Sequence, residues 1–281
     1  MRRRARRAFQ NHVYQASKLQ SAQNSLNSNV FRVYVGANGQ DWFSFDILNT
    51  QALEAMVDNQ FNAGTQNRNI RDFRMLMKGF KLKVTIANQI DANQTSPAIL
   101  DMYFLVPRFD IDWDEFSRYV GNNGNILARY FKEGASGVLP TGELQPNFQG
   151  DSIPDFGKIG FTPFMYQAFC RMFKVVKIKT IKLPIGETYI SDFSVRSKYI
   201  NPSRFLTKLA PSGAQQARRS KMYLKGISST VLCRVRGTPG FQEEPGTSIS
   251  RPVNLSVVWE EQCTCKVMQT RPGSVSQDIN A

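Results

Sequence analysis

The chain has 281 residues and a formal net charge of +14, and 41% of its residues are hydrophobic. This length and composition exclude an intrinsically disordered chain and predict a globular protein that buries its core without disulfides or metals. The excess of Lys and Arg favours a phosphate-rich partner, and no apolar run reaches the ~18–20 residues of a membrane span.

The N-terminus concentrates positive charge, because MRRRARR places five arginines in seven positions: Arg2, Arg3, Arg4, Arg6 and Arg7. Like charges this dense repel one another, so the segment is expected to be disordered by itself. It is interpreted as a nucleic-acid-binding arm that doubles as a nuclear import signal, as a mitochondrial transit peptide, or as a solubilising tail. The arginines form one block and are not spread over an amphipathic helix, which favours the arm.

Residues 10–29 are rich in Gln, Asn and Ser and predict a linker, so arm and linker together span 1–28. The folded domain is expected over 29–269 and a polar tail over 270–281.

Short β segments separated by turns follow. We expect strands at 30–35, 41–48, 72–88, 99–106, 126–131, 169–188, 189–200, 222–235 and 253–267. The clearest is 72–88, in which Phe80, Leu82, Val84 and Ile86 share one face. A short helix is expected at 50–57, with Thr50 at its N-cap.

Two further stretches carry turn or loop signals. The aspartates of 109–119 resemble a calcium loop, but the glycine and glutamate of that loop are missing, so they predict the acidic first turn of a short helix. Residues 133–160 and 201–220 contain several Gly and Pro residues and predict long surface loops.

The stretch 169–188, FCRMFKVVKIKTIKLPIGET, is expected to be a long strand ended by Pro184 and Gly186. Its alternation is imperfect, which predicts a bulge or a crossing between sheets. Its lysines are interpreted either as solvated side chains of a half-buried strand or as a basic ladder that faces a polyanion. These lysines are Lys174, Lys177, Lys179 and Lys182.

About eight principal strands, little helix and long connections predict an all-β protein. The profile is that of a sandwich or jelly roll, here with a basic N-terminal arm and long loops.

Catalytic and metal signatures are missing. His12, the one histidine, lies in the basic linker, which removes most Ser-His-Asp, Cys-His and His-based metal arrangements. The four cysteines lack zinc-site spacing and predict buried free thiols, with Cys263 and Cys265 facing the same way. We expect no enzyme activity, no cofactor and no metal site.

The order of these features resembles a known family. After the arginine-rich arm come DWFSFDIL, MKGFKLKVTIAN and AILDMYFLV, then a Gly/Pro loop, FTPFMYQAFCRMFKVVKIKTIKLPIGETY, and VNLSVVWEEQCTCKVM. This order, and most specifically the pattern over 162–187, resembles the capsid proteins of small circular single-stranded DNA viruses, the circovirus-like group. Ile185, inserted after Pro184, departs from the Pro-Gly-Glu often found there.

The resemblance implies a single eight-stranded jelly roll of two facing antiparallel sheets. It also implies a virion protein that assembles in the host nucleus into an icosahedral shell of about 60 subunits. It implies that the arm arginines bind a single-stranded DNA genome, with the four lysines of 169–188 and Arg218 and Arg219 as a second tier. The alternatives are the coat protein of a small RNA virus, because an arginine arm does not distinguish the nucleic acids, and a cellular or organellar nucleic-acid-binding protein. A host receptor and the triangulation number are not predicted.

Overall fold

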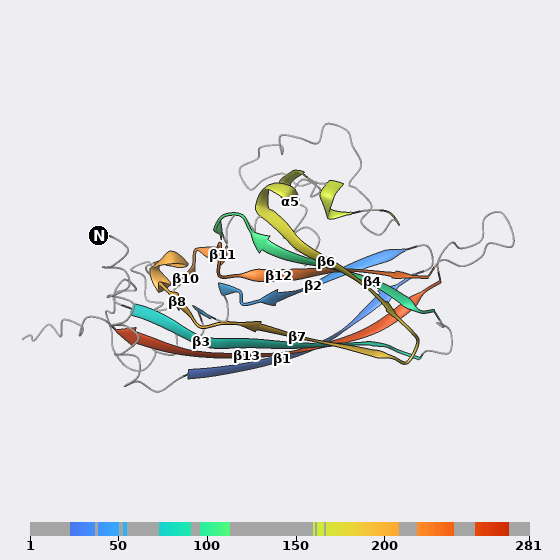
Figure 1. Cartoon of the computed structure of the whole chain (residues 1–281), viewed down its shortest axis with the longest axis horizontal. Helices are drawn as coiled ribbons and strands as arrows, with labels where there is room; N and C mark the ends of the chain where they lie inside the picture. The colour runs from blue at the N-terminus through green and yellow to red at the C-terminus, as the bar shows by residue number, and fades with distance from the viewer. Residues whose placement is uncertain are drawn as a thin grey trace, which may run out of the picture.

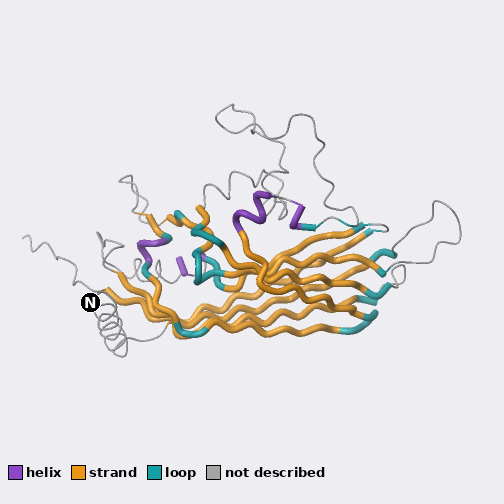
Figure 2. Tube along the Cα trace, turned by 45° about the horizontal axis from the view of Figure 1, so that its top comes forward, coloured by secondary structure: helices purple, strands orange, loops and turns teal. Residues whose placement is uncertain are grey.

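The computed structural model describes residues 23–36, 39–50, 53–54, 73–90, 96–112, 160, 162–165, 167–207, 218–238 and 251–269, and every contact below lies among them. Two antiparallel sheets face each other as the layers of a sandwich (Figure 1, Figure 2). Within this part of the chain, no helix is long and apolar enough to cross a membrane.

The two sheets have the strand order of a jelly roll. The first sheet contains, in spatial order, β1 (Gln23–Val35), β13 (Val253–Gln269), β3 (Phe73–Asn88) and β7 (Thr188–Val195), and β8 (Lys198–Ile200) also pairs with β3. The second contains β2 (Gln40–Ile47), β12 (Ser229–Gly237), β4 (Ala98–Pro107) and β6 (Phe173–Leu183). In chain order, the chain passes from one sheet to the other between β1 and β2, β2 and β3, β3 and β4, β6 and β7, β8 and β12, and β12 and β13. The predicted jelly roll is therefore confirmed.

Several short strands and helices lie outside the two main sheets. They are β5 (Ile111–Asp112), which pairs with β11 (Lys221–Tyr223); β9 (Leu206–Thr207), which pairs with β10 (Arg218–Arg219); and η3 (Pro163–Met165), α5 (Gln167–Met172) and η4 (Pro202–Arg204).

The main core fills the space between the sheets, as the alternation of β3 predicts. Phe80, Leu82, Val84 and Ile86 are at most 1% exposed, whereas the intervening lysines of β3 are exposed. Burial of each such side chain contributes about 1.5–3 kcal/mol, so this face fixes the register of the strand.

A second core covers the outer face of the second sheet. Phe169, Met172 and Phe173 are buried there with Tyr103 and Tyr223. The expected strand 169–188 is therefore wrong over its first four residues, which form the end of α5. The spacing i, i+3, i+4 of the three apolar residues suits a helical turn packed on a sheet, and tertiary packing decides the local structure.

The corner between β6 and β7 contains the expected turn. Gly186 has φ 75°, and the Glu187 N–H donates to Pro184 O at 3.3 Å, as in a type II turn. Buried Asn88 secures this corner, because its amide donates to Leu183 O at 3.0 Å and its backbone carbonyl accepts the Gly186 N–H at 2.8 Å.

The first strand begins earlier than expected. β1 starts at Gln23, so 23–29 is strand and not linker, because β13 is 17 residues long and offers pairing partners as far as Cys265. The ladder with β13 overrides the polar composition of this segment. β13 ends at Gln269, the last described residue of the chain.

Four other expectations need correction. The segment 222–235 is two strands, because Gly226 (φ 75°) forms a turn between β11 and β12. Ile111–Asp112 is strand β5 and not the start of a helix, and 201–220 contains η4, β9 and β10. Residues 50, 53 and 54 are helical as expected; Thr50 lies within the helix and not before it, and its hydroxyl lies within hydrogen-bond distance of Lys221 O, at 2.7 Å. The strand expected at 126–131, most of the loop at 133–160 and the tail at 270–281 lie outside the described residues.

Candidate nucleic-acid interface

The lysines predicted as second-tier contacts lie on β6, an edge strand of the second sheet. All four side chains are exposed, together with Val176 (55%) and Ile178 (49%). Among the described strands, only β4 pairs with β6, so one side of β6 is open. We call this strand, with Lys174, Lys177, Lys179 and Lys182, the lysine strand.

The predicted irregularity is confirmed. The pairing of β4 with β6 shifts between Phe104 and Leu105, which leaves Val176 as an extra residue in β6. Without the bulge, residues 174 and 177 would point to opposite sides, because their separation is odd. The bulge places Lys174 and Lys177 on the same side of the sheet.

The register shows which way each lysine points. Lys177 lies opposite Phe104 and Lys179 opposite Met102, on the side of the sheet that faces the other layer. Lys182 lies opposite Ile99, on the outer side. Three lysines therefore line the open edge between the two sheets, whereas the fourth does not.

Two aromatic side chains accompany these lysines. The Lys177 ammonium lies 5.8 Å from the centroid of the Phe104 ring. The Lys179 ammonium donates to the Tyr189 hydroxyl at 2.9 Å and lies 4.8 Å from the centroid of that ring. Tyr189 belongs to β7 in the other sheet, so Lys179 connects the two layers at their open edge. Ammonium groups attract phosphates, and the aromatic rings beside them offer surfaces on which bases stack.

A buried ion pair holds the lysine strand to its sheet. Asp101 is 4% exposed and accepts hydrogen bonds from Thr180 of β6 (2.6 Å) and from Arg234 of β12 (2.6 and 3.0 Å). Burial alone would raise the pKa of Asp101, but these hydrogen bonds and the charges of Arg234 and Arg236 lower it below its ordinary value. Asp101 therefore stays ionised and joins three strands in one row.

The arginines at 218 and 219 lie elsewhere. They form β10, in a two-stranded sheet separate from the one that holds β6, and Figure 1 places β10 at the end of the sandwich with β8 and β11. Of the predicted second-tier residues, the four lysines therefore lie along an edge of the sandwich, and the two arginines lie at one end of it.

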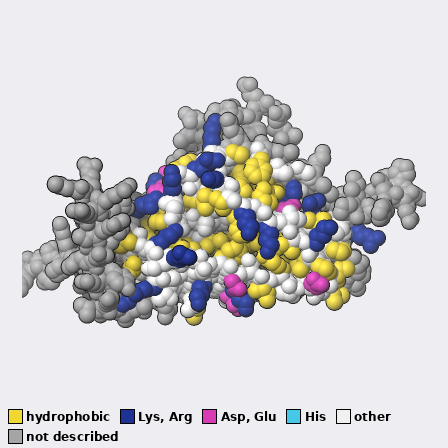
Figure 3. Space-filling view, viewed as in Figure 1, with side chains coloured by type: hydrophobic (Ala, Val, Ile, Leu, Met, Phe, Trp, Pro, Cys, Tyr) yellow, Lys and Arg dark blue, Asp and Glu magenta, His cyan; other side chains and the backbone are white. Residues whose placement is uncertain are grey.

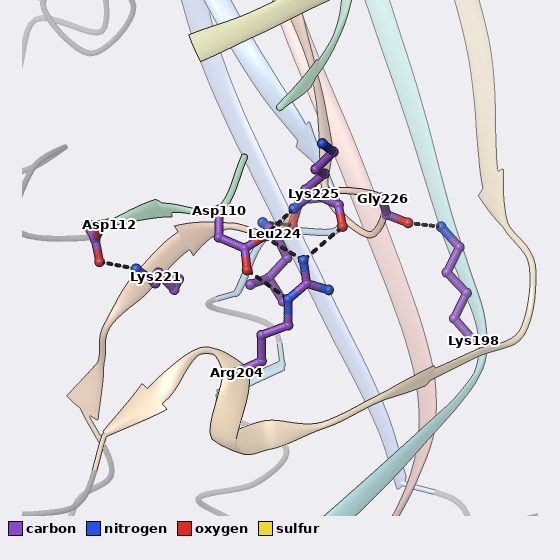
Figure 4. Close-up of polar contacts among 9 residues, drawn as sticks. Asp110, Asp112, Lys198, Arg204, Lys221, Leu224, Lys225 and Gly226 are labelled. Carbon is purple, nitrogen blue, oxygen red and sulfur yellow. Dashed lines mark hydrogen bonds and ion pairs between the residues drawn. The ribbon is translucent and has the colours of Figure 1, made fainter. Parts of the chain in front are cut away.

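Acidic residues neutralise part of this end (Figure 4). Asp110 accepts two hydrogen bonds from Arg204 (2.5 and 2.8 Å) and one from the Lys225 N–H (2.8 Å), and Asp112 pairs with Lys221. Burial raises the pKa of Asp110, but the bonds from Arg204 and Lys225 outweigh it, and the pKa lies below its ordinary value. Residues 193–242 contain no Asp or Glu, so Asp110 and Asp112, from outside that stretch, compensate part of its positive charge in the fold.

Figure 3 shows basic side chains spread along the face that presents β6 and β7, with hydrophobic surface between them and few acidic side chains. The five arm arginines lie outside the described residues, so they remain a prediction.

Tyr189, Phe104 and Asp101 were not anticipated as members of this surface. The turn at Gly186 is the one sequence signal for Tyr189, because a chain that reverses there returns past Lys179. No signal pointed to Asp101, whose partner Arg234 is 133 positions away.

The thiols are free, as expected, and three of them are buried: Cys233, Cys263 and Cys265. Burial raises the pKa of Cys263 and of Cys265 to about 12, with a smaller contribution from a neighbouring ionisable group, so both remain protonated and unreactive. Within the described ranges, no group of three or more His, Cys, Asp and Glu could hold a metal ion.

Comparison with known proteins gives weak likenesses. No protein-family model and no curated protein matches the chain. Among solved structures, it is similar to a Merkel cell polyomavirus virus-like particle, with 9% identity and a TM-score of 0.26 over 95% of this chain and 81% of the other. It is also similar to the Macrobrachium rosenbergii nodavirus, with 10% identity and a TM-score of 0.25 over 91% of this chain and 57% of the other. At these scores the likenesses carry no argument about function, which depends on the residues themselves.

Proposed function

We propose that the protein is a viral capsid protein that assembles into a closed shell and packages single-stranded nucleic acid, with DNA as the expected cargo. The observation that carries the proposal is the arginine block MRRRARR at residues 1–7, which precedes β1, the first described strand of a jelly roll, with residues 8–22 between them. A jelly roll supplies a rigid unit for symmetric association, and dense arginines neutralise phosphates.

The basic groups have two roles in this proposal. Arg2, Arg3, Arg4, Arg6 and Arg7 bind the nucleic-acid backbone by charge, without reading sequence. The lysine strand adds an ordered basic edge, where Lys177 and Lys179 stand beside aromatic rings. Arg218 and Arg219 add charge at the end of the sandwich.

The test is deletion of residues 2–7 from the full chain. We expect the deleted protein to fold and to keep most shell contacts but to lose nucleic-acid uptake, because the arm precedes the described strands. A matched variant with all five arginines changed to lysine keeps the charge and should retain most uptake, because phosphate neutralisation by counterion release depends on charge. Circular dichroism measures folding, and nuclease-protected nucleic acid measures uptake. A deleted protein that failed to fold would show that the arm is structural, and one that packaged normally would remove the arm from the proposal.

The cargo is identified by sequencing the protected nucleic acid. DNA supports the expected class, whereas RNA would move the protein to the coat proteins of small RNA viruses, because counterion release does not distinguish the two. Cleavage of the first ~30 residues inside cells would instead favour an organellar nucleic-acid-binding protein.

A further inference from the structure

The first strand leaves an edge of the first sheet open. β1 pairs with β13 along one side, and no described strand pairs with its other side. An edge strand of 13 residues offers unpaired N–H and C=O groups as a template for another strand. Lysines, prolines and bulges usually protect such an edge, but 23–35 contains no lysine and no proline, and its pairing with β13 has no register shift.

The outer face of β1 also carries three exposed apolar or aromatic side chains. Leu26 is 75% exposed, Val30 64% and Tyr34 57%, and they are every fourth residue along one side of the strand. Arg32 carries the one charge of the strand. We call Leu26, Val30 and Tyr34 the apolar edge.

The pattern is complementary to itself in the antiparallel direction. With a two-fold axis at Val30, each Leu26 lies opposite the Tyr34 of a second copy, and the two Val30 residues lie opposite each other. Arg32 then lies opposite Ser28, so no like charges meet. If the two-fold axis lay two residues closer to the C-terminus, the two Arg32 side chains would lie opposite each other.

A groove lies beside Leu26, the residue that faces the second copy's Tyr34 in this arrangement. A cavity of about 710 Å³ crosses the first sheet and is lined by Leu26 and Ser28 of β1 and by residues of β13, β3 and β7. In the register centred on Val30, Tyr34 of the second copy lies opposite Leu26, at the rim of this groove. Tyr34 and the groove beside Leu26 are therefore each four residues from the two-fold axis at Val30, on opposite sides of it.

We infer that β1 pairs antiparallel with β1 of a second copy of this chain, about a two-fold axis at Val30. The two first sheets then form one continuous sheet through an isologous interface. In the single chain the Val30 N–H donates to Asn29 Oδ1 at 2.8 Å. In the dimer this N–H bonds instead to the carbonyl of the opposing Val30. The dimer does not depend on the proposed packaging function, because it can form without a shell or nucleic acid.

The first test is cross-linking in the full chain. In the dimer, residues 30 of the two copies are about 5.5 Å apart at Cα, whereas residues 32 are about 14 Å apart along the strands. Val30→Cys should therefore give a species of about 64 kDa, twice the 31.9 kDa chain, after oxidation or treatment with a short bifunctional maleimide. Arg32→Cys, also on the outer face of β1, is the matched control and should cross-link about tenfold less. Equal yields from both variants, or none from Val30→Cys, would overturn the inferred register.

The second test is association without cross-linking. Val30→Lys places two ammonium groups opposite each other and should weaken dimerisation about tenfold or more in light scattering. Ile190→Lys is the control, because Ile190 is 54% exposed on β7, the opposite edge of the same sheet. Both variants should keep the wild-type circular dichroism spectrum. If Ile190→Lys weakened association as much as Val30→Lys, or if neither variant did, the β1 interface would be refuted. A β1 dimer that never forms a shell would refute the proposed function and leave this interface standing.

Discussion

Two edge strands of this sandwich are similar in length and opposite in chemistry. β6 has 11 residues and carries four lysines and a bulge, whereas β1 has 13 residues, one arginine and a regular ladder. Charge and irregularity keep another strand away from β6, but neither protects β1. This difference is the basis for proposing a polyanion as the partner of the basic edge and another protein chain as the partner of the apolar edge.

The edges also differ in how they are held to the fold. β6 joins its sheet through a backbone ladder and a buried carboxylate, Asp101, which Thr180 and Arg234 contact from both sides. β1 depends on its ladder with β13 and on Val33 and Val35, which are buried in the main core. The following substitutions separate what individual side chains near the two edges contribute to stability and to binding.

The largest effect is expected from Asp101→Ala. Its removal leaves the Arg234 guanidinium buried without its carboxylate, which should lower the free energy of unfolding by about 3–5 kcal/mol. Urea unfolding measures this loss. Asp192→Ala, at an exposed position on β7, should change stability by no more than about 0.5 kcal/mol. A loss below about 1 kcal/mol at Asp101 would mean that the ladder alone secures β6.

Glu261 tests the inner side of β1, because it lies opposite Asn27 in the ladder. Burial, with a smaller contribution from Asp46, raises its pKa from 4.5 to about 7, and its Oε1 atom is buried without a hydrogen bond. The folded state therefore holds the proton more tightly than the unfolded state. The resulting stability is complete below about pH 4.5 and is lost as the pH rises through about 7.

Glu261→Gln should remove this pH dependence and stabilise the protein by about 1–2 kcal/mol at pH 8, after allowance for partial solvent exposure. Thermal unfolding from pH 4 to pH 8 checks it. Glu260→Gln, on the exposed face of the same strand, should leave the pH profile unchanged. If the stability of the wild type rose between pH 5 and 7 while that of Glu261→Gln stayed constant, the raised pKa of Glu261 would be contradicted.

The lysine strand should influence binding more than folding. Lys177→Gln with Lys179→Gln removes about two phosphate contacts and should reduce the salt slope for single-stranded DNA by about 1.4. The same change at Lys81 and Lys83 removes equal charge from the outer face of β3 and is the matched control. Fluorescence anisotropy at several salt concentrations measures both. Equal slopes for the two pairs would mean that net charge, and not the edge, governs binding.

The smallest effect is expected from Tyr189→Phe. It removes the hydrogen bond from Lys179 but keeps the ring beneath the ammonium, so stability should fall by about 0.5–1 kcal/mol. Tyr189→Leu removes the ring as well and should weaken DNA binding, which Tyr189→Phe should not. If both variants bound DNA as tightly as the wild type, Tyr189 would have no part in the interface.

The features that the sequence predicted depend on local periodicity. Alternation placed Phe80, Leu82, Val84 and Ile86 on one face of β3, and the broken alternation of β6 indicated its bulge. Turn residues marked the corner at Gly186. From these and the number of strands, a sandwich or jelly roll and the exposure of the β6 lysines were both predictable, and the family resemblance selected the jelly roll.

The features that the sequence did not predict depend on register between distant segments. The start of β1 at Gln23 depends on the length of β13, and the pairing of Asp101 with Arg234 depends on how β4 aligns with β12. Asp110 and Asp112 indicated a helix N-terminus, but partners about 90–110 positions away hold them in and beside β5 instead. Local composition contains none of this information.

The central claim, assembly around nucleic acid, is tested most directly by light scattering on the purified full-length protein with absorbance recorded at 260 and 280 nm. The account predicts a species of about 1.9 MDa, near 60 copies of the 31.9 kDa chain, that carries nuclease-protected nucleic acid. A 32 kDa monomer that stayed monomeric when nucleic acid was added would contradict it.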